Sequence, residues 1–138
     1  HLLSMPGGGS RHPATEQTVK DGLHVLKMAG REVFKHAVNA MTESGRQAMA
    51  RAGVGIGDIA CVIPHQANQR IVQAVAERLG APPERCYVNL DRCGNMSAAS
   101  IPVALDEALR KGAVKPGDLA LLVAFGGGFT WGAMVVEV

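Results

Sequence analysis

A run of six residues, Ile59–Pro64, contains only apolar side chains and is followed directly by polar ones. An uninterrupted apolar run of this length is typical of a strand that is buried on both faces, as in a parallel sheet. Residues 68–79 then carry apolar side chains at three- and four-residue steps before Gly80, which indicates an amphipathic helix. A strand that leads into such a helix predicts an α/β fold with a site at the carboxyl end of the strand.

Two further helices and three further strands are predicted in the rest of the chain. Apolar residues at helical spacing predict one helix over residues 30–52 and another that begins at Ser97 or Ser100 and ends at Lys111. Each further strand is a short apolar segment bounded by turn-forming residues. These strands are expected over residues 86–90, 119–125 and 129–138. This order of elements predicts a mixed sheet covered by helices.

Pro and Gly divide the chain into two regions. Residues 1–28 contain Pro6, Pro13 and a run of three glycines, which break regular structure, so a loop-rich N-terminal segment is expected there. Residues 29–138 carry the periodic segments. A hydrophobic content of 47% in a chain of 138 residues suffices for one domain with its own core.

Charge and cysteine usage exclude several classes of function. A net charge of +2 is too small for a nucleic-acid-binding surface, and no apolar run approaches the roughly 20 residues of a membrane span. The three cysteines are odd in number and lack metal-ligand spacing, which favours reduced thiols in a cytoplasmic protein and no metal site. Cys61 and Cys86 fall in apolar strands, where a thiolate is disfavoured. Cys93 has no base fixed beside it, so none of the three is given a role.

His65 is the first polar residue after the apolar strand. A single His at such a place is most often structural. Gln66, Asn68 and Arg70 favour a functional site instead, because we expect no core role for amides and a guanidinium gathered at a strand end. They also stand at the start of a helix, where backbone N–H groups are available to an anion or a carbonyl oxygen.

Asn95 follows Gly94 in the segment after the predicted 86–90 strand. Glycine permits unusual backbone angles and close approach of a ligand, although an ordinary turn is the simpler interpretation of this pair alone. Residues 95–97 match a glycosylation acceptor, which has no meaning in a cytoplasmic protein. A neutral His and an Asn can both donate hydrogen bonds to one developing oxyanion, and the loss of one such donor typically costs about 3–4 kcal/mol of barrier.

Three consecutive glycines, Gly126, Gly127 and Gly128, separate the last two predicted strands. A phosphate cradle is disfavoured, because no Lys-Ser/Thr pair follows and the next element is a strand rather than a helix. A tight hairpin is one alternative. Another is a backbone N–H that faces a substrate carbonyl, for which glycine gives access, and the residues leave both open.

Four segments together resemble the C-terminal half of β-ketoacyl-acyl carrier protein synthase III, a condensing enzyme of the thiolase superfamily. They occur in the family's order: residues 28–35 (MAGREVFK), 64–71 (PHQANQRI), 89–100 (NLDRCGNMSAAS) and 124–132 (AFGGGFTWG). The resemblance implies a thiolase-like α/β half that packs against a second, similar half, and a homodimeric enzyme. It also implies initiation of fatty-acid synthesis from acyl-CoA and malonyl-acyl carrier protein, both substrates, without a cofactor.

The resemblance assigns the chemistry to His65 and Asn95. In the family, a cysteine of the N-terminal half takes an acyl group as a thioester. His65 and Asn95 would then bind the thioester oxygen of malonyl-acyl carrier protein and stabilise the enolate that forms as carbon dioxide leaves. The Gly127 N–H would belong to the oxyanion hole for the acyl-enzyme carbonyl, with Phe125 packed beside the nucleophile.

The resemblance also implies binding residues. The pantetheine tunnel would be lined by Gly30, Phe34, Ala37, Ala67 and Asn68. Lys35 and Arg70 would meet the acidic carrier protein, through an attraction that salt weakens.

The sequence departs from the family in three places. The half with the nucleophilic cysteine is absent from the 138 residues, so the chain alone is expected to be inactive. Glu77 and Arg78 stand where some relatives carry two lysines, and Cys93 stands where His is common. A relative from secondary-metabolite or quinolone synthesis would carry the same His65 and Asn95. A non-catalytic binding or dimerisation half is the alternative outside enzymes.

Overall fold

The computed structural model describes residues 2–138, which form two compact units, one ending at His36 and the other running from Ala37 to Val138. In the first unit, β1 (Leu3–Ser4) pairs antiparallel with β2 (Lys27–Met28). Most of the segment between these strands is irregular, as its Pro and Gly content predicts.

The N-terminal segment also contains a short helix that the sequence prediction missed, α1 (Glu16–Lys20). Thr15 caps it: the Thr15 hydroxyl accepts a hydrogen bond from the Thr18 N–H at 3.1 Å, and the Thr18 hydroxyl accepts one from the Thr15 N–H at 2.9 Å. This reciprocal cap stabilises a helix too short to show apolar periodicity.

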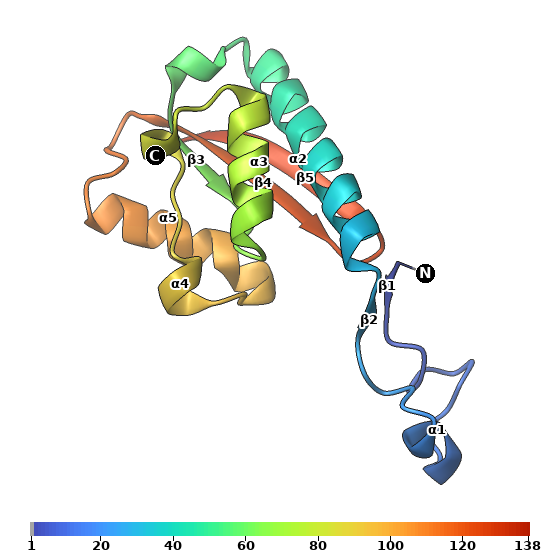
Figure 1. Cartoon of the computed structure of the whole chain (residues 1–138). Helices are drawn as coiled ribbons and strands as arrows, with labels where there is room; N and C mark the ends of the chain where they lie inside the picture. The colour runs from blue at the N-terminus through green and yellow to red at the C-terminus, as the bar shows by residue number, and fades with distance from the viewer. Residues whose placement is uncertain (1) are drawn as a thin grey trace. The chain divides into compact units, whose positions relative to one another are not determined.

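The second unit is built on a three-stranded mixed sheet in the order β3–β4–β5 (Figure 1). β3 (Ile59–Pro64) runs parallel to β4 (Leu119–Gly126), with Pro64 opposite Val123. β4 turns back into β5 (Thr130–Glu137), its antiparallel neighbour. The apolar run that predicts a buried strand is therefore one edge of this sheet and β5 is the other, among the residues described.

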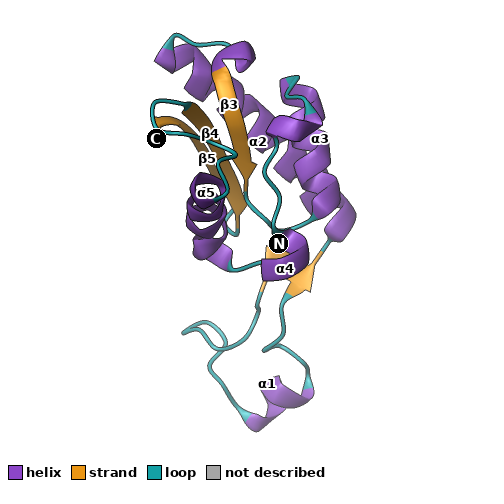
Figure 2. Ribbon diagram, turned by 90° about the vertical axis from the view of Figure 1, so that its left-hand side faces the viewer, coloured by secondary structure: helices purple, strands orange, loops and turns teal. Residues whose placement is uncertain are grey.

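Helices cover both faces of the sheet (Figure 2). α2 (Gly30–Ala52) and α3 (Gln69–Leu79) lie over one face and α5 (Ser100–Arg110) over the other. Because side chains alternate along a strand, β3 contributes to both layers. The α5 layer is made of small and branched residues that pack closely: Cys61, Ile63, Ala104, Ala108, Val114 and Ala120.

Gly45 lets α2 lie close to the face of the sheet that α5 does not cover. A Cβ at this position would lie 3.2 Å from Leu79 Cδ2 of α3 and 3.3 Å from Val123 Cγ1 of β4. Both distances are tighter than ordinary packing, so the absence of a side chain at Gly45 sets how near α2 comes to α3 and the sheet. A helix-interior glycine here serves packing rather than a turn.

The predicted strand over residues 86–90 is wrong. Cys86 makes a single parallel bridge to Val62, and the Tyr87 N–H donates to the Val62 carbonyl oxygen at 2.9 Å. The chain then leaves the sheet at the buried Asn89 and forms a short helix, α4 (Leu90–Cys93). Strand propensity at these residues is overridden because the Asn89 side chain binds a helix rather than the sheet.

The other predicted elements are confirmed within a few residues. α2 has the predicted bounds, and α3 begins after Asn68, which caps it, and ends before Gly80, whose φ is +76°. Three single-turn 3₁₀ helices, at Ile56–Asp58, Pro83–Arg85 and Ser97–Ala99, complete the second unit. No helix among residues 2–138 is both long and apolar enough to cross a membrane.

Candidate functional site

His65 lies immediately beyond the carboxyl end of β3. Its backbone N–H donates to the Val123 carbonyl oxygen at 2.8 Å, which continues the parallel ladder for one more residue and fixes the His65 backbone against β4. The ring is half-buried, and this burial lowers the pKa of His65. The imidazole is therefore neutral at pH 7 and presents one N–H donor.

Gln66 is fully buried, so the expectation that the amides after β3 have no core role is wrong for this residue. Its Nε2 donates to the carbonyl oxygens of Pro64 and Tyr87, at 2.7 and 3.2 Å. Its Oε1 accepts from the Asn89 N–H at 3.1 Å. Gln66 thus joins the strand end that carries His65 to the segment that leads into α4.

Asn95 lies in the loop after α4. Gly94 has a φ of +67°, a conformation that a residue with a side chain rarely adopts, and its N–H donates to the Leu90 carbonyl oxygen to close α4. The Asn95 side chain is held by its oxygen, since Oδ1 accepts from the Ser97 N–H at 2.9 Å. Among residues 2–138, the Asn95 Nδ2 group and the His65 ring nitrogens have no hydrogen-bond partner, so both side chains keep donors available.

Glu107 on α5 links the start of α4 to the helix layer. Its carboxylate accepts from Asn89 Nδ2 at 2.9 Å and also binds Arg92 of α4 and Lys111. Hydrogen bonds from Lys111 and Asn89 hold the pKa of Glu107 at about 2, so it is ionised at neutral pH. The sequence analysis did not single out Glu107, because two of its partners, Arg92 and Asn89, lie 15 and 18 residues away in the chain.

Gly126 ends β4, and Gly127, Gly128 and Phe129 form the turn of the β4–β5 hairpin, which confirms the hairpin interpretation. Gly127 is exposed in this turn, and its carbonyl oxygen accepts from the Thr130 hydroxyl at 3.1 Å. A Cβ on Gly128, whose φ is +138°, would lie 2.9 Å from Thr130 Cγ2, so glycine is required there. Phe125 packs its ring on Phe129, with centroids 4.8 Å apart.

The residues expected to bind pantetheine or the carrier protein occur in two places along the chain. Gly30, Phe34, Lys35 and Ala37 belong to the N-terminal turns of α2, where Lys35 lies 3.6 Å from Glu32 as an exposed ion pair. Ala67, Asn68 and Arg70 form the start of α3, where the Asn68 Oδ1 accepts from the Arg70 N–H at 2.9 Å. Asn68 therefore occupies one of the backbone donors that the sequence analysis left to a ligand.

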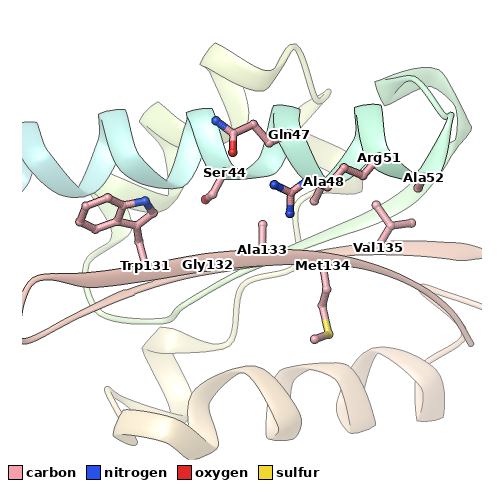
Figure 3. Close-up of a pocket in the computed structure, with 10 residues that line it drawn as sticks. All are labelled: Ser44, Gln47, Ala48, Arg51, Ala52, Trp131, Gly132, Ala133, Met134 and Val135. Carbon is pink, nitrogen blue, oxygen red and sulfur yellow. The ribbon is translucent and has the colours of Figure 1, made fainter.

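A groove lies apart from these residues, between α2 and β5 (Figure 3). This groove has a volume of about 470 Å³. Trp131, Ala133 and Val135 point from β5 toward α2, whereas Met134 points to the opposite side of the strand. The groove contains none of the residues expected to carry chemistry.

Cys61 is buried, whereas Cys86 and Cys93 are partly exposed. Burial raises the pKa of the Cys61 thiol to about 11 and that of Cys86 to about 12, which confirms that thiolates are disfavoured in these positions. Among residues 2–138, no group of three or more His, Cys, Asp or Glu side chains is arranged to hold a metal ion.

Comparison with known proteins gives the family. Residues 49–138 match the family model described as 3-oxoacyl-[acyl-carrier-protein (ACP)] synthase III C terminal. The chain belongs to this family. The β-ketoacyl-[acyl-carrier-protein] synthase III of Desulfitobacterium hafniense (strain DSM 10664 / DCB-2) is 60% identical over 136 residues, which cover 99% of this chain and 41% of that protein.

Solved structures agree. The crystal structure of β-ketoacyl-[acyl carrier protein] synthase III from Thermus thermophilus is 43% identical, with a TM-score of 0.85, over 99% of this chain and 41% of that one. The priming β-ketosynthase of the R1128 polyketide pathway is 34% identical, with a TM-score of 0.82, over 99% and 40%. The predicted thiolase-like α/β fold class is confirmed, and the chain spans about two fifths of the length of these relatives.

Proposed function

We propose that this chain is the C-terminal part of a condensing enzyme that initiates fatty-acid synthesis, with His65 and Asn95 stabilising the enolate formed by decarboxylation. The observation that carries the proposal is a pair of side chains with available donors, one beyond β3 and the other beyond α4. Their segments are joined through the buried Gln66. Family membership and the name of the D. hafniense relative support the reaction type.

The two donors suit the charge that develops in this reaction. When the malonyl carboxylate leaves as carbon dioxide, the electron pair of the broken C–C bond moves into the thioester carbonyl, whose oxygen becomes an enolate. A neutral imidazole N–H and an amide N–H stabilise that oxygen without bringing a proton that would quench the carbanion. The carbanion then attacks the acyl thioester on a cysteine outside this chain, the new C–C bond forms, and the cysteine thiolate leaves.

The β4–β5 hairpin and the N-terminal ends of α2 and α3 carry the residues assigned to the acyl-enzyme, the pantetheine arm and the carrier protein. In this proposal the exposed Gly127 N–H binds the acyl-enzyme carbonyl, and Phe125 packs beside the nucleophile. Lys35 and Arg70 are exposed, as carrier-protein docking requires. In this proposal the pantetheine arm contacts Ala67 and Asn68, which are exposed before α3, whereas Ala37 is buried in the core.

The proposed reaction needs a partner half. In this proposal the nucleophilic cysteine lies in a part of the enzyme that this chain does not contain, so the chain alone is inactive. The chain spans 41% of the D. hafniense relative. Trp131 and Met134 are 58% and 55% exposed on β5, an edge strand among the described residues. Exposed apolar side chains on an open edge favour a surface that packs on another part of the enzyme. The homodimer and the cytoplasmic location stay predictions.

A chimera tests the proposal. This chain would replace the matched C-terminal part of the D. hafniense enzyme, and decarboxylation of malonyl-acyl carrier protein would be followed as release of carbon dioxide. We expect the chimera to turn over and its His65→Ala variant to lose on the order of 100-fold or more in rate. The matched control is Gln73→Ala, an exposed amide on α3. Full turnover in His65→Ala would refute the role given to His65.

A priming ketosynthase of a polyketide pathway is the second candidate, favoured by the structural match at 34% identity. His65 and Asn95 keep the same roles in it. The two differ in the acyl group and the carrier protein they accept. A fatty-acid enzyme is expected to prefer the carrier protein of fatty-acid synthesis, and a preference for a polyketide carrier protein in a competition assay would favour the second candidate.

A further inference from the structure

We infer that Gln66 and Glu107 are positioning residues that hold the Asn95 loop in register with His65. The inference rests on the proposed function, because it concerns the geometry of the two donors. It comes from one continuous chain of hydrogen bonds that runs from the end of β3, through Asn89, to α5. In this inference neither Gln66 nor Glu107 contacts the substrate.

The first link fixes the start of α4 to β3. Gln66 is the residue after His65 and has no exposed surface. Its Nε2 group donates to the carbonyl oxygens of Pro64 and Tyr87, and its Oε1 accepts from the Asn89 N–H. Because one buried amide makes all three hydrogen bonds, residues 87–89 are held in a single position relative to β3. Breaking any of these bonds would leave a buried polar group without a partner.

The second link fixes the rest of α4 to α5. Glu107 binds the side chain of Asn89, which precedes α4, and that of Arg92, which lies two residues before Gly94. Both ends of this single-turn helix are therefore tied to one carboxylate. A helix of four residues has too few internal hydrogen bonds to hold its own orientation, so these outside contacts set where the chain emerges at Asn95.

Position matters more than stability at such a site. Donors to an oxyanion have to be held within roughly 0.5 Å of the productive geometry, and a misplacement of about 1 Å costs on the order of 100-fold in rate. Asp106, the neighbour of Glu107 on α5, gives the matched contrast. It pairs with Arg110 one turn along the same helix, so its loss removes an acidic side chain from α5 without touching α4.

The experiment uses the chimera described above with the variants Glu107→Gln, Gln66→Leu and Asp106→Asn. Two half-reactions are measured separately: acylation of the nucleophilic cysteine by acyl-CoA, from the mass of the acyl-enzyme, and decarboxylation of malonyl-acyl carrier protein. We expect decarboxylation to fall by about 10- to 100-fold in Glu107→Gln, with acylation at the parent rate. Asp106→Asn should match the parent in both.

Several outcomes overturn the inference. Equal losses in both half-reactions would mean that Glu107 acts only through stability, and unchanged decarboxylation would mean that the link does not position Asn95. If Gln66→Leu does not fold, Glu107→Gln decides, since Glu107 lies on a helix surface. The His65→Ala chimera separates the two proposals: its full activity defeats the proposed function, whereas its inactivity beside an active Glu107→Gln defeats only the positioning role.

Discussion

The carboxyl end of β3 and the groove along β5 are two open regions of the same sheet, and they differ in how their side chains are held. At β3, a buried amide and a shared carboxylate fix two loops, while His65 and Asn95 keep donors available. Along β5, a groove of about 470 Å³ lies beside α2 and leaves Trp131 exposed. The contrast teaches that a groove need not hold the chemistry. We propose the reaction site where side chains are fixed in place with available donors, and a contact with another part of the enzyme where Trp131 and Met134 are exposed.

The largest expected effect is at Asn95. In the chimera, Asn95→Ala removes one of the two enolate donors, and we expect decarboxylation to slow by roughly 100- to 1,000-fold. Acyl-enzyme formation, measured by mass, should stay within about twofold of the parent if donor loss acts only on the second half-reaction. If Asn95→Ala decarboxylates at the parent rate, the carboxyl end of β3 is no better a candidate for the reaction site than the groove.

Substitutions in the groove along β5 should weaken association with the N-terminal part of the enzyme rather than slow the reaction itself. With this chain and the N-terminal part of the D. hafniense enzyme as separate polypeptides, Trp131→Ser should weaken their binding by on the order of 10-fold or more, measured by calorimetry, since a buried aromatic is a common interface anchor. Leu109→Ser, at an exposed apolar position of α5, serves as the control. Equal affinities for both variants would show that β5 does not face the partner.

Carrier-protein docking is expected to depend on charge. Arg70→Glu at the start of α3 should raise the KM for malonyl-acyl carrier protein by about 3- to 10-fold at low salt, and the difference should shrink as salt screens the charges. Its kcat should change little. Lys115→Glu, in the exposed turn before β4, makes the same charge change away from the start of α3 and is expected to leave KM unaltered. A salt-independent effect, or the same shift in both variants, would contradict the assignment.

The smallest expected effect is a pH-dependent shift in melting temperature. The pKa of Glu107 is depressed from 4.5 to about 2, so its ion pairs stabilise the folded chain above pH 4.5 and are lost as pH falls toward 2. The melting temperatures of the parent chain and Glu107→Gln should therefore differ by a few degrees at pH 6 and converge at low pH. A difference that is constant from pH 6 to 2.5 would argue that Glu107 is not the titrating group.

The catalytic candidates came from the resemblance of four segments to a known family, because local signals alone left them open. A single His after an apolar run is most often structural, and Asn95 after Gly94 also fits an ordinary turn. The burial of Gln66 was not predicted, because a local sequence pattern indicates only which nearby residues face solvent. It does not reveal a distant partner such as Tyr87, 21 residues later, whose carbonyl oxygen makes burial of the amide favourable.

The sequence by itself determined the α/β order, the strand Ile59–Pro64 and the bounds of α2, because apolar periodicity acts over a few residues. Only the tertiary structure decided that residues 86–90 leave the sheet, that Gln66 is core, and that Glu107 joins α4 to α5. Those outcomes depend on hydrogen bonds between groups 15 to 23 residues apart, whose strength comes from burial that no local window reveals.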